Sequence, residues 1–307
     1  MVSSTQVLVG TIKVKMKFLI IGKSGQLSRE LQRTLKGSEH LIDVQDSRKI
    51  DFDDLDVLSN ELDKSDFDVL VNTVAWTDVD AAEKNAEEAF RVNANWPKHL
   101  ALAVKNQRKA FVQISTDYVF SGESTTPWEI DSKTQPINTY GKTKVLSEEY
   151  IQDIYSENTY IFRTSWLYSS FRKNFVKTMI SAALRDDQRI NVVDDQLGQP
   201  TSAKDLASQI VKALEQEIKP GIYHATNSGI ASWNSFAKMI FELIGENPDR
   251  VIPLSSASLV RDAVRPKYSV LSHQCWSNTG IHAMRPWQDA LENQIDEIKK
   301  VVIAEGQ

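Results

Sequence analysis

Residues 22–28, with the sequence GKSGQLS, restrict the fold more than any other segment of the chain. They follow an apolar run at residues 18–21 and precede leucines spaced four apart, which indicates a buried strand, a tight turn and an amphipathic helix. Gly22 permits the turn, Gly25 lets a pyrophosphate approach the helix N-terminus, and Ser28 is small enough for close helix–strand packing. Because such a segment also occurs as a plain turn with a helix cap, the surrounding pattern must support a dinucleotide site.

The rest of the first half supplies that pattern. Short apolar runs at residues 41–44, 68–74, 110–114 and 160–162 alternate with helical periodicity at 81–104 and 142–154. Strands buried on both faces have this composition, so we predict an α/β fold with a Rossmann-type, doubly wound parallel sheet. Residues 16–170 are the expected dinucleotide-binding domain.

After about residue 170 the pattern is more helical and less regular. We expect helices at residues 174–184, 203–214, 233–244 and 286–302, and a strand at 221–225. Residues 171–307 are therefore predicted to form a smaller, mixed α/β substrate-binding domain. Residues 1–15 lack a signal-peptide pattern and are expected to be an N-terminal extension before a fold that starts at Met16, with disorder or an added β-strand as the alternatives for its structure.

Composition excludes several classes of partner and site. The net charge is -5, and no long basic run is present, which argues against nucleic acid. The apolar runs have strand length, which argues against a membrane span. Cys275 is the only cysteine, so the chain has no internal disulfide and no cysteine-based metal cluster. These features indicate a cytoplasmic protein.

Acidic residues after the second predicted strand bear on the choice of cofactor. Asp46 lies where a carboxylate accepts hydrogen bonds from the adenine ribose and repels a 2′-phosphate, which slightly favours NADH over NADPH. Arg48 lies close enough to pair with such a phosphate, so both cofactors stay open. Asp51 and Phe52 lie where a loop covers an adenine ring, although a capping role for Asp51 is an alternative.

The strongest chemical motif combines Tyr140 and Lys144 with Thr116. Tyr140 and Lys144 are four residues apart on a predicted helix and so share a face. A free tyrosine has a pKa of about 10, and an adjacent ammonium favours its phenolate. Thr116 follows a predicted strand and offers a hydroxyl to a substrate carbonyl. Together they predict hydride transfer from a nicotinamide, with Tyr140 as the general acid.

These motifs, in this order, resemble the extended short-chain dehydrogenase/reductases and, within them, the dTDP-4-dehydrorhamnose reductase family. The similarity extends from Met16 almost to the end of the chain. The matching stretches are residues 22–27, 71–80, 114–120, 136–144, 162–168, 174–179, 195–201 and 265–266. The family fold implies that residues 190–214 return to the dinucleotide-binding domain.

The resemblance also implies roles for individual residues. Gln26 and Leu27 belong to the cofactor-binding loop, Lys144 binds the nicotinamide ribose, and Tyr140 donates the proton. The residues implied at the nicotinamide are Ala75, Trp76 and Thr77. The residues implied at the sugar nucleotide are Thr116, Asp117, Trp166, Asn174 and Arg265, of which Trp166 is equally compatible with a core position.

Two departures from the family pattern affect these expectations. Trp76 stands where relatives often carry histidine, which makes the substrate preference less secure. Some relatives dimerise through a magnesium site built from surface glutamates. Glu30 matches one of these ligands, but Lys204 falls where another would be, so we expect no metal and a monomer or weak homodimer.

The activity implied by the resemblance is reduction of the 4-keto group of dTDP-4-dehydro-L-rhamnose to dTDP-L-rhamnose with NADH or NADPH, for cell-surface polysaccharide synthesis. One alternative is a reductase of another 4-keto sugar nucleotide. A second, from a different class, is a non-catalytic regulatory subunit resembling that of methionine adenosyltransferase. Thymine and uracil differ by one methyl group, so the nucleotide base also stays open.

Overall fold

The computed structural model describes residues 15–306, and the predicted extension at residues 1–15 lies almost entirely outside them. Six strands form the main sheet: β1 (Lys17–Ile21), β2 (Leu41–Gln45), β3 (Val69–Asn72), β4 (Ala110–Thr116), β5 (Thr159–Thr164) and β10 (Gly221–His224). Their order is β10-β5-β4-β3-β1-β2, and every neighbouring pair is parallel. The predicted α/β fold with a doubly wound, Rossmann-type sheet is confirmed.

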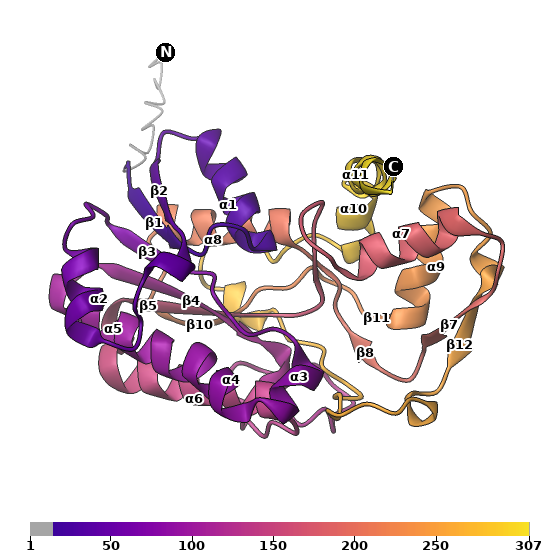
Figure 1. Cartoon of the computed structure of the whole chain (residues 1–307), viewed down its shortest axis with the longest axis horizontal. Coiled ribbons are helices and arrows are strands. Elements are labelled where there is room, and N and C mark those ends of the chain that lie inside the picture. Colours follow the sequence, from indigo (N-terminus) through magenta and orange to yellow (C-terminus); the bar gives the residue numbers. More distant parts are fainter. Residues whose placement is uncertain (1–14, 307) are drawn as a thin grey trace, which may run out of the picture.

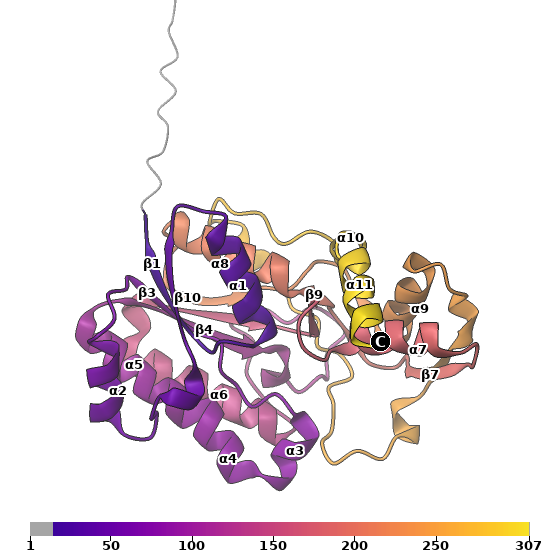
Figure 2. The ribbon, with the colours of Figure 1, turned by 45° about the horizontal axis from the view of Figure 1, so that its top comes forward.

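Helices cover both faces of this sheet (Figures 1 and 2). One face carries α1 (Gln26–Lys36) and α8 (Ala203–Glu215), and the other carries α2 (Leu55–Leu62), α5 (Trp96–Gln107) and α6 (Thr139–Tyr155). Successive residues of a strand point to opposite faces. In β1, Phe18 and Ile20 therefore join the core under α1 and α8, whereas Leu19 and Ile21 join the core on the other side.

The predicted helical stretch at residues 81–104 is divided in the structure. It comprises α3 (Val79–Lys84), α4 (Ala86–Phe90), a π-helical turn (Arg91–Asn95) and α5. A single period of 3.6 residues cannot describe this region, because the π turn rotates the helix surface by an extra residue. Asn93, which is buried, lies in this turn and bonds to residues of the candidate site described below.

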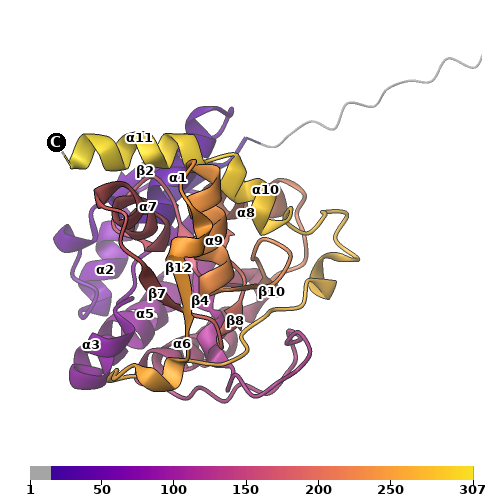
Figure 3. The same ribbon diagram turned by 90° about the vertical axis from the view of Figure 1, so that its right-hand side faces the viewer.

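The second lobe is built from helices and short strand pairs around its own core (Figure 3). Its helices are α7 (Phe175–Arg185), α9 (Trp233–Leu243), α10 (Trp287–Glu292) and α11 (Ile295–Glu305). Its short strands are β6 (Leu167–Tyr168), β7 (Ile190–Val193), β8 (Leu197–Gly198), β9 (Thr201–Ser202), β11 (Ala231–Ser232) and β12 (Val251–Leu254). They pair as β6 with β9, β7 with β12, and β8 with β11, none of which the sequence pattern predicted.

Two predicted boundaries differ from the structure. The predicted return of residues 190–214 is wrong at its start, because β7 pairs with β12 in the second lobe. The chain returns with α8, which packs on α1, and continues into β10 at the sheet edge.

The predicted helix at residues 286–302 is also wrong, because it is the two helices α10 and α11. The side chain of Gln294 is buried at the break and donates hydrogen bonds to the Ser202 hydroxyl and, at 3.3 Å, to the Ala290 carbonyl. Between residues 15 and 306, no helix combines the length and the apolar character needed to cross a membrane.

Candidate active site

The glycine loop between β1 and α1 has the geometry of an anion site. Gly22 has a φ of 104°, and a Cβ there would lie 2.6 Å from Thr73 Oγ1, so only glycine fits. At Gly25, a Cβ would meet nothing closer than the Thr73 carbonyl at 4.0 Å. No side chain of the described residues caps α1, so the N–H groups of its first turn are free for a phosphate.

Gln26 and Leu27 lie at the start of α1, and the side chains of both already contact other parts of the protein. Leu27 is buried in the core beneath α1, so only its backbone faces the loop. The Gln26 amide hydrogen-bonds to the segment that follows β5: it donates to the Leu167 carbonyl at 3.3 Å and accepts from Ser169 Oγ at 3.1 Å. The cofactor loop is thereby tied to the second lobe.

The predicted cofactor residues after β2 are two aspartates that cap local turns and one buried phenylalanine. Asp46 caps a 3-10 turn and accepts hydrogen bonds from the Arg48 side chain, whose guanidinium holds the pKa of Asp46 well below its usual range. Asp51 accepts from the backbone of Asp53 at 3.0 Å, a local cap. Phe52 is buried and stacks on Trp96 at 4.6 Å between ring centroids, so its ring belongs to the core.

The carboxyl end of β4 brings the predicted carbonyl-binding residue to the sheet edge. The buried Thr116 donates its hydroxyl to Asp117 Oδ1 at 3.0 Å and accepts from the Tyr118 backbone at 3.2 Å. Burial raises the pKa of Asp117 to about 7, although the Ser269 and Thr116 hydroxyls lower it. Asp117 is thus a partner of Thr116, and its buried carboxyl has little surface for a sugar nucleotide.

Tyr140 and Lys144 lie on successive turns of α6, as predicted, but their pKa values do not follow the prediction. Burial raises the pKa of Tyr140 to about 12, with a further increase from Asp117 and a decrease from the Thr116 hydroxyl. The Lys144 ammonium donates to the Ile114 carbonyl at 2.6 Å, and burial lowers its pKa to about 8. The predicted lowering of the Tyr140 pKa is therefore wrong in this structure, where burial dominates and keeps the phenol protonated at neutral pH.

Behind Lys144 lies a buried ion pair that sequence reasoning missed. Glu148, one turn further along α6, accepts from Arg163 of β5 at 3.0 and 2.6 Å and from the Ser115 hydroxyl of β4. Both side chains of the pair are almost fully buried. The charge of Glu148 also raises the pKa of Lys144 against the effect of burial. The only sequence signal was its spacing of four from Lys144.

Two further polar residues, also missed, hold the N-terminal part of α6. Asn93 in the π turn exchanges hydrogen bonds with the Trp76 backbone at 2.8 and 2.9 Å and donates to Thr143 Oγ1 at 3.0 Å. Glu83 of α3 accepts from both the backbone and the hydroxyl of Thr139 at 2.7 Å. The loop after β3, with Ala75 half-buried and Thr77 exposed, is thereby joined to the helix that carries Tyr140.

The other predicted sugar-nucleotide residues, Trp166, Asn174 and Arg265, lie in three different places. Trp166 follows β5 and adopts a φ of 45°. Its ring stacks on that of Trp233, with centroids 3.6 Å apart, and the sequence did not indicate Trp233 as a site residue. Asn174 caps α7 and donates to Gln26 Oε1 at 3.0 Å. Arg265 pairs with Asp80 of α3, with an N–O distance of 2.6 Å, so its guanidinium already has a carboxylate partner.

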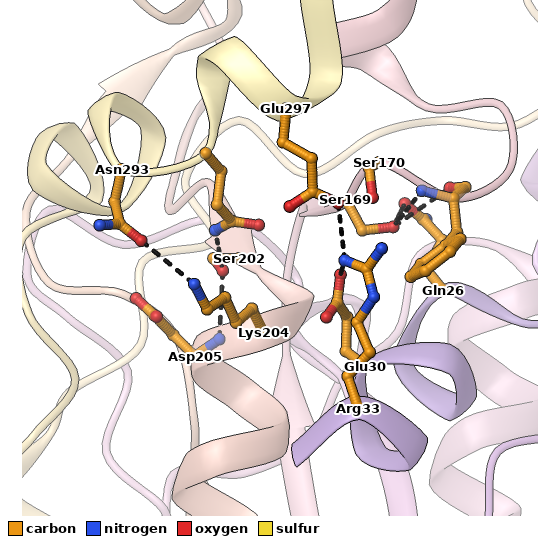
Figure 4. Close-up of polar contacts among 12 residues, drawn as sticks. Gln26, Glu30, Arg33, Ser169, Ser170, Ser202, Lys204, Asp205, Asn293 and Glu297 are labelled. Carbon is orange, nitrogen blue, oxygen red and sulfur yellow. Dashed lines mark hydrogen bonds and ion pairs between the residues drawn. The ribbon is translucent and has the colours of Figure 1, made fainter. Parts of the chain in front are cut away.

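Figure 4 shows the surroundings of Glu30 and Lys204. Arg33 lies between Glu30 and Glu297, at 3.6 and 2.6 Å, and Lys204 approaches Asn293 Oδ1 at 3.4 Å. Glu30 is buried, which raises its pKa. Cations therefore already face the carboxylates here, and the described residues contain no group of three or more His, Cys, Asp or Glu that could hold a metal ion.

Comparison with known proteins agrees with this geometry. The family model for the RmlD substrate binding domain matches residues 16–300. A dTDP-4-dehydrorhamnose reductase of Streptomyces griseus is 39% identical over 279 residues, covering 90% of this chain and 91% of that protein. A dTDP-4-keto-6-deoxy-D-glucose reductase of Streptomyces niveus is 36% identical over 276 residues, covering 90% of this chain and 95% of that protein.

The solved structures include a dTDP-4-dehydrorhamnose reductase of Bacillus anthracis in complex with NADP. It superposes with a TM-score of 0.88 and 33% identity, covering 92% of this chain and all of that one. Sequence, fold and the order of the site motifs thus agree over nearly the whole length. The chain belongs to the family of the RmlD substrate binding domain, the dTDP-4-dehydrorhamnose reductase family.

Proposed function

We propose that this chain reduces the 4-keto group of dTDP-4-dehydro-L-rhamnose to dTDP-L-rhamnose with NADPH or NADH. The observation that carries the proposal is the meeting of Thr116, Tyr140 and Lys144 at the carboxyl edge of the sheet that also carries the glycine loop. The relatives reported above are named for reductases of dTDP-linked keto sugars. We also propose that the enzyme acts in the cytoplasm, as a monomer or weak homodimer without a metal.

The cofactor supplies hydride when it is bound at the free N-terminus of α1. The protein supplies the rest: the Thr116 hydroxyl, turned from Asp117 Oδ1 to the ketone oxygen, orients the ketone, and Tyr140 delivers its proton to that oxygen as negative charge develops. A Tyr140 pKa raised to about 12 keeps this proton in place at neutral pH. Lys144, anchored on the Ile114 carbonyl, places a positive charge one helical turn from the phenol.

The direct test is turnover by the purified chain. With dTDP-4-dehydro-L-rhamnose, we expect loss of reduced-nicotinamide absorbance and transfer of deuterium from labelled cofactor to the sugar C4. Other dTDP- and UDP-linked 4-keto sugars, measured in parallel, rank the substrates. If none of these sugars causes oxidation of the cofactor, the proposal is overturned. Stoichiometric co-purification with a synthetase would then favour a regulatory role.

The charge of Lys144 predicts the alkaline side of the pH profile. Its folded-state pKa is lowered to about 8, so the ammonium is present below this pH and is lost above it. We expect kcat/KM to fall as pH rises through about 8, well before Tyr140 titrates. Steady-state rates in overlapping buffers measure this. A profile that stays flat up to the Tyr140 pKa would show that the charge of Lys144 does not contribute.

The pair formed by Asp46 and Arg48 predicts the response to the two cofactors. The Arg48 side chain is 86% exposed, so it can turn from Asp46 toward a 2′-phosphate. We expect wild-type enzyme to use both cofactors with a modest preference for NADH. Arg48→Ala should raise the KM for NADPH by roughly tenfold or more, because the charged hydrogen bond to the 2′-phosphate is lost and Asp46 no longer has a neutralising cation. The KM for NADH should change much less. Equal changes for both cofactors would contradict this assignment.

A further inference from the structure

One face of α1 contacts the connector of residues 166–174, which joins β5 to α7 (Figure 4). Gln26, Arg29 and Arg33 lie on this face at helical spacing. The Gln26 amide bonds to the connector, as described above, and both arginines lie over the Phe171 ring, at 4.8 and 4.3 Å from its centroid. The connector is therefore attached to the cofactor-binding helix along much of its length.

Gln26 has a special place in this contact because it touches two different sites. Its backbone N–H is in the free first turn of α1, where a cofactor phosphate would bind. Its side-chain oxygen accepts from Asn174 Nδ2 at 3.0 Å and Ser169 Oγ at 3.1 Å, and its nitrogen donates to the Leu167 carbonyl at 3.3 Å. The oxygen of this amide and one of its two N–H groups are thus bonded to the connector.

The connector carries residues of the second lobe at both of its ends. It begins at Trp166, two residues after the end of β5, where Thr164 is paired with Thr116 of β4. It ends at Asn174, whose Oδ1 caps α7 by accepting from the Lys177 backbone at 3.1 Å. Gln26 thus bonds to a connector that continues to Trp166 on one side and to α7 on the other.

We propose that Gln26 is a positioning residue that couples cofactor binding to sugar-nucleotide binding through its hydrogen bonds with Asn174 and Ser169. A phosphate on the first turn of α1 orders Gln26, and Gln26 then orders the connector that carries Trp166. Coupling between two ligands is reciprocal, so the sugar nucleotide must also tighten cofactor binding. The inference rests on the proposed function, because it assumes a sugar nucleotide in the second lobe.

The test measures binding without turnover. NADPH and dTDP-L-rhamnose are both reduced and cannot react, so the Kd of NADPH can be determined with and without the sugar nucleotide, for example from nicotinamide fluorescence. For the wild type we expect NADPH to bind roughly fivefold or more tightly when dTDP-L-rhamnose is present. For Gln26→Met and Asn174→Ser this factor should fall to about one, and the double variant should show no further loss.

The variants are chosen to keep the fold. Methionine is close to glutamine in size, and the serine hydroxyl still caps α7 but is too short to reach Gln26. Gln32→Met is the matched control, since Gln32 lies on the same helix and, among residues 15–306, its side chain bonds only to Lys23 and Ser28 of that helix and its loop. It should retain the wild-type coupling.

The possible outcomes separate the two proposals. Wild-type coupling in both variants would overturn the role of Gln26 while leaving the reductase function intact. Failure of wild-type enzyme to bind dTDP-L-rhamnose would overturn the proposed function and this inference with it. A loss of coupling in Gln32→Met as well would show that general loosening of α1, and not the bond to Asn174, is responsible, which also overturns the inference.

Discussion

Replacing Tyr140 with phenylalanine is expected to lower kcat by about two to four orders of magnitude, the usual contribution of a general acid. The ring stays, so its edge-on packing against Tyr118, with centroids 5.9 Å apart, is preserved. Only the proton donor is removed. The KM values for cofactor and sugar should therefore change little, whereas the deuterium isotope effect of hydride transfer should grow as chemistry becomes rate-limiting.

Tyr150→Phe provides the matched control for this prediction. Tyr150 lies ten residues further along the same helix, where Lys98 approaches its ring at 4.8 Å from the centroid. It should retain wild-type kcat. Substantial turnover in Tyr140→Phe would exclude Tyr140 as the proton donor and would point to a solvent molecule or another side chain in that role.

Replacing Glu148 with leucine is expected to lower the free energy of unfolding by about 3–5 kcal/mol, the usual effect of removing one partner from a buried ion pair. Arg163 would keep a buried charge with only the Ile130 carbonyl, at 3.1 Å, and the His224 ring, at 3.4 Å, as neighbouring acceptors. Ser115 would lose its acceptor as well. Denaturant unfolding followed by tryptophan fluorescence measures the change.

Two comparisons make this result interpretable. The exposed pair of Lys64 and Glu61, 2.7 Å apart, should contribute almost nothing, so Glu61→Gln is the surface control. The double variant Glu148→Leu/Arg163→Met removes both charges and should recover much of the lost stability. If the single variant is as stable as the control, the pair is better solvated than its burial indicates.

The local pattern of the chain was sufficient to predict the sheet, because strands buried on both faces are recognisable as short apolar runs. It failed in the second lobe, where β6, β8, β9 and β11 have two residues each. Such short strands have no period to detect, and their partners are distant in sequence. It also failed at Gln294, where a side-chain bond to Ser202, 92 positions away, ends one helix before the next begins.

The site shows the same division. Gly22, Thr116, Tyr140 and Lys144 could be proposed from the sequence because each proposed chemistry requires a particular residue type at a particular spacing. The partners of these residues were not. Asn93 and Glu83 reach α6 from separate elements, and nothing in their local sequence distinguishes them from ordinary surface residues.

By itself, the sequence determined the parallel α/β fold and the glycine turn after β1, and it indicated the candidate phosphate-binding and proton-transfer residues, since these depend on local periodicity and on glycine and tyrosine chemistry. Only the tertiary structure decided which groups surround them. Burial, and not the spacing of Lys144, sets the pKa of Tyr140 to about 12. Likewise, Gln26 and Asn174, predicted to contact different ligands, contact each other, because folding brings residues 148 positions apart within 3.0 Å.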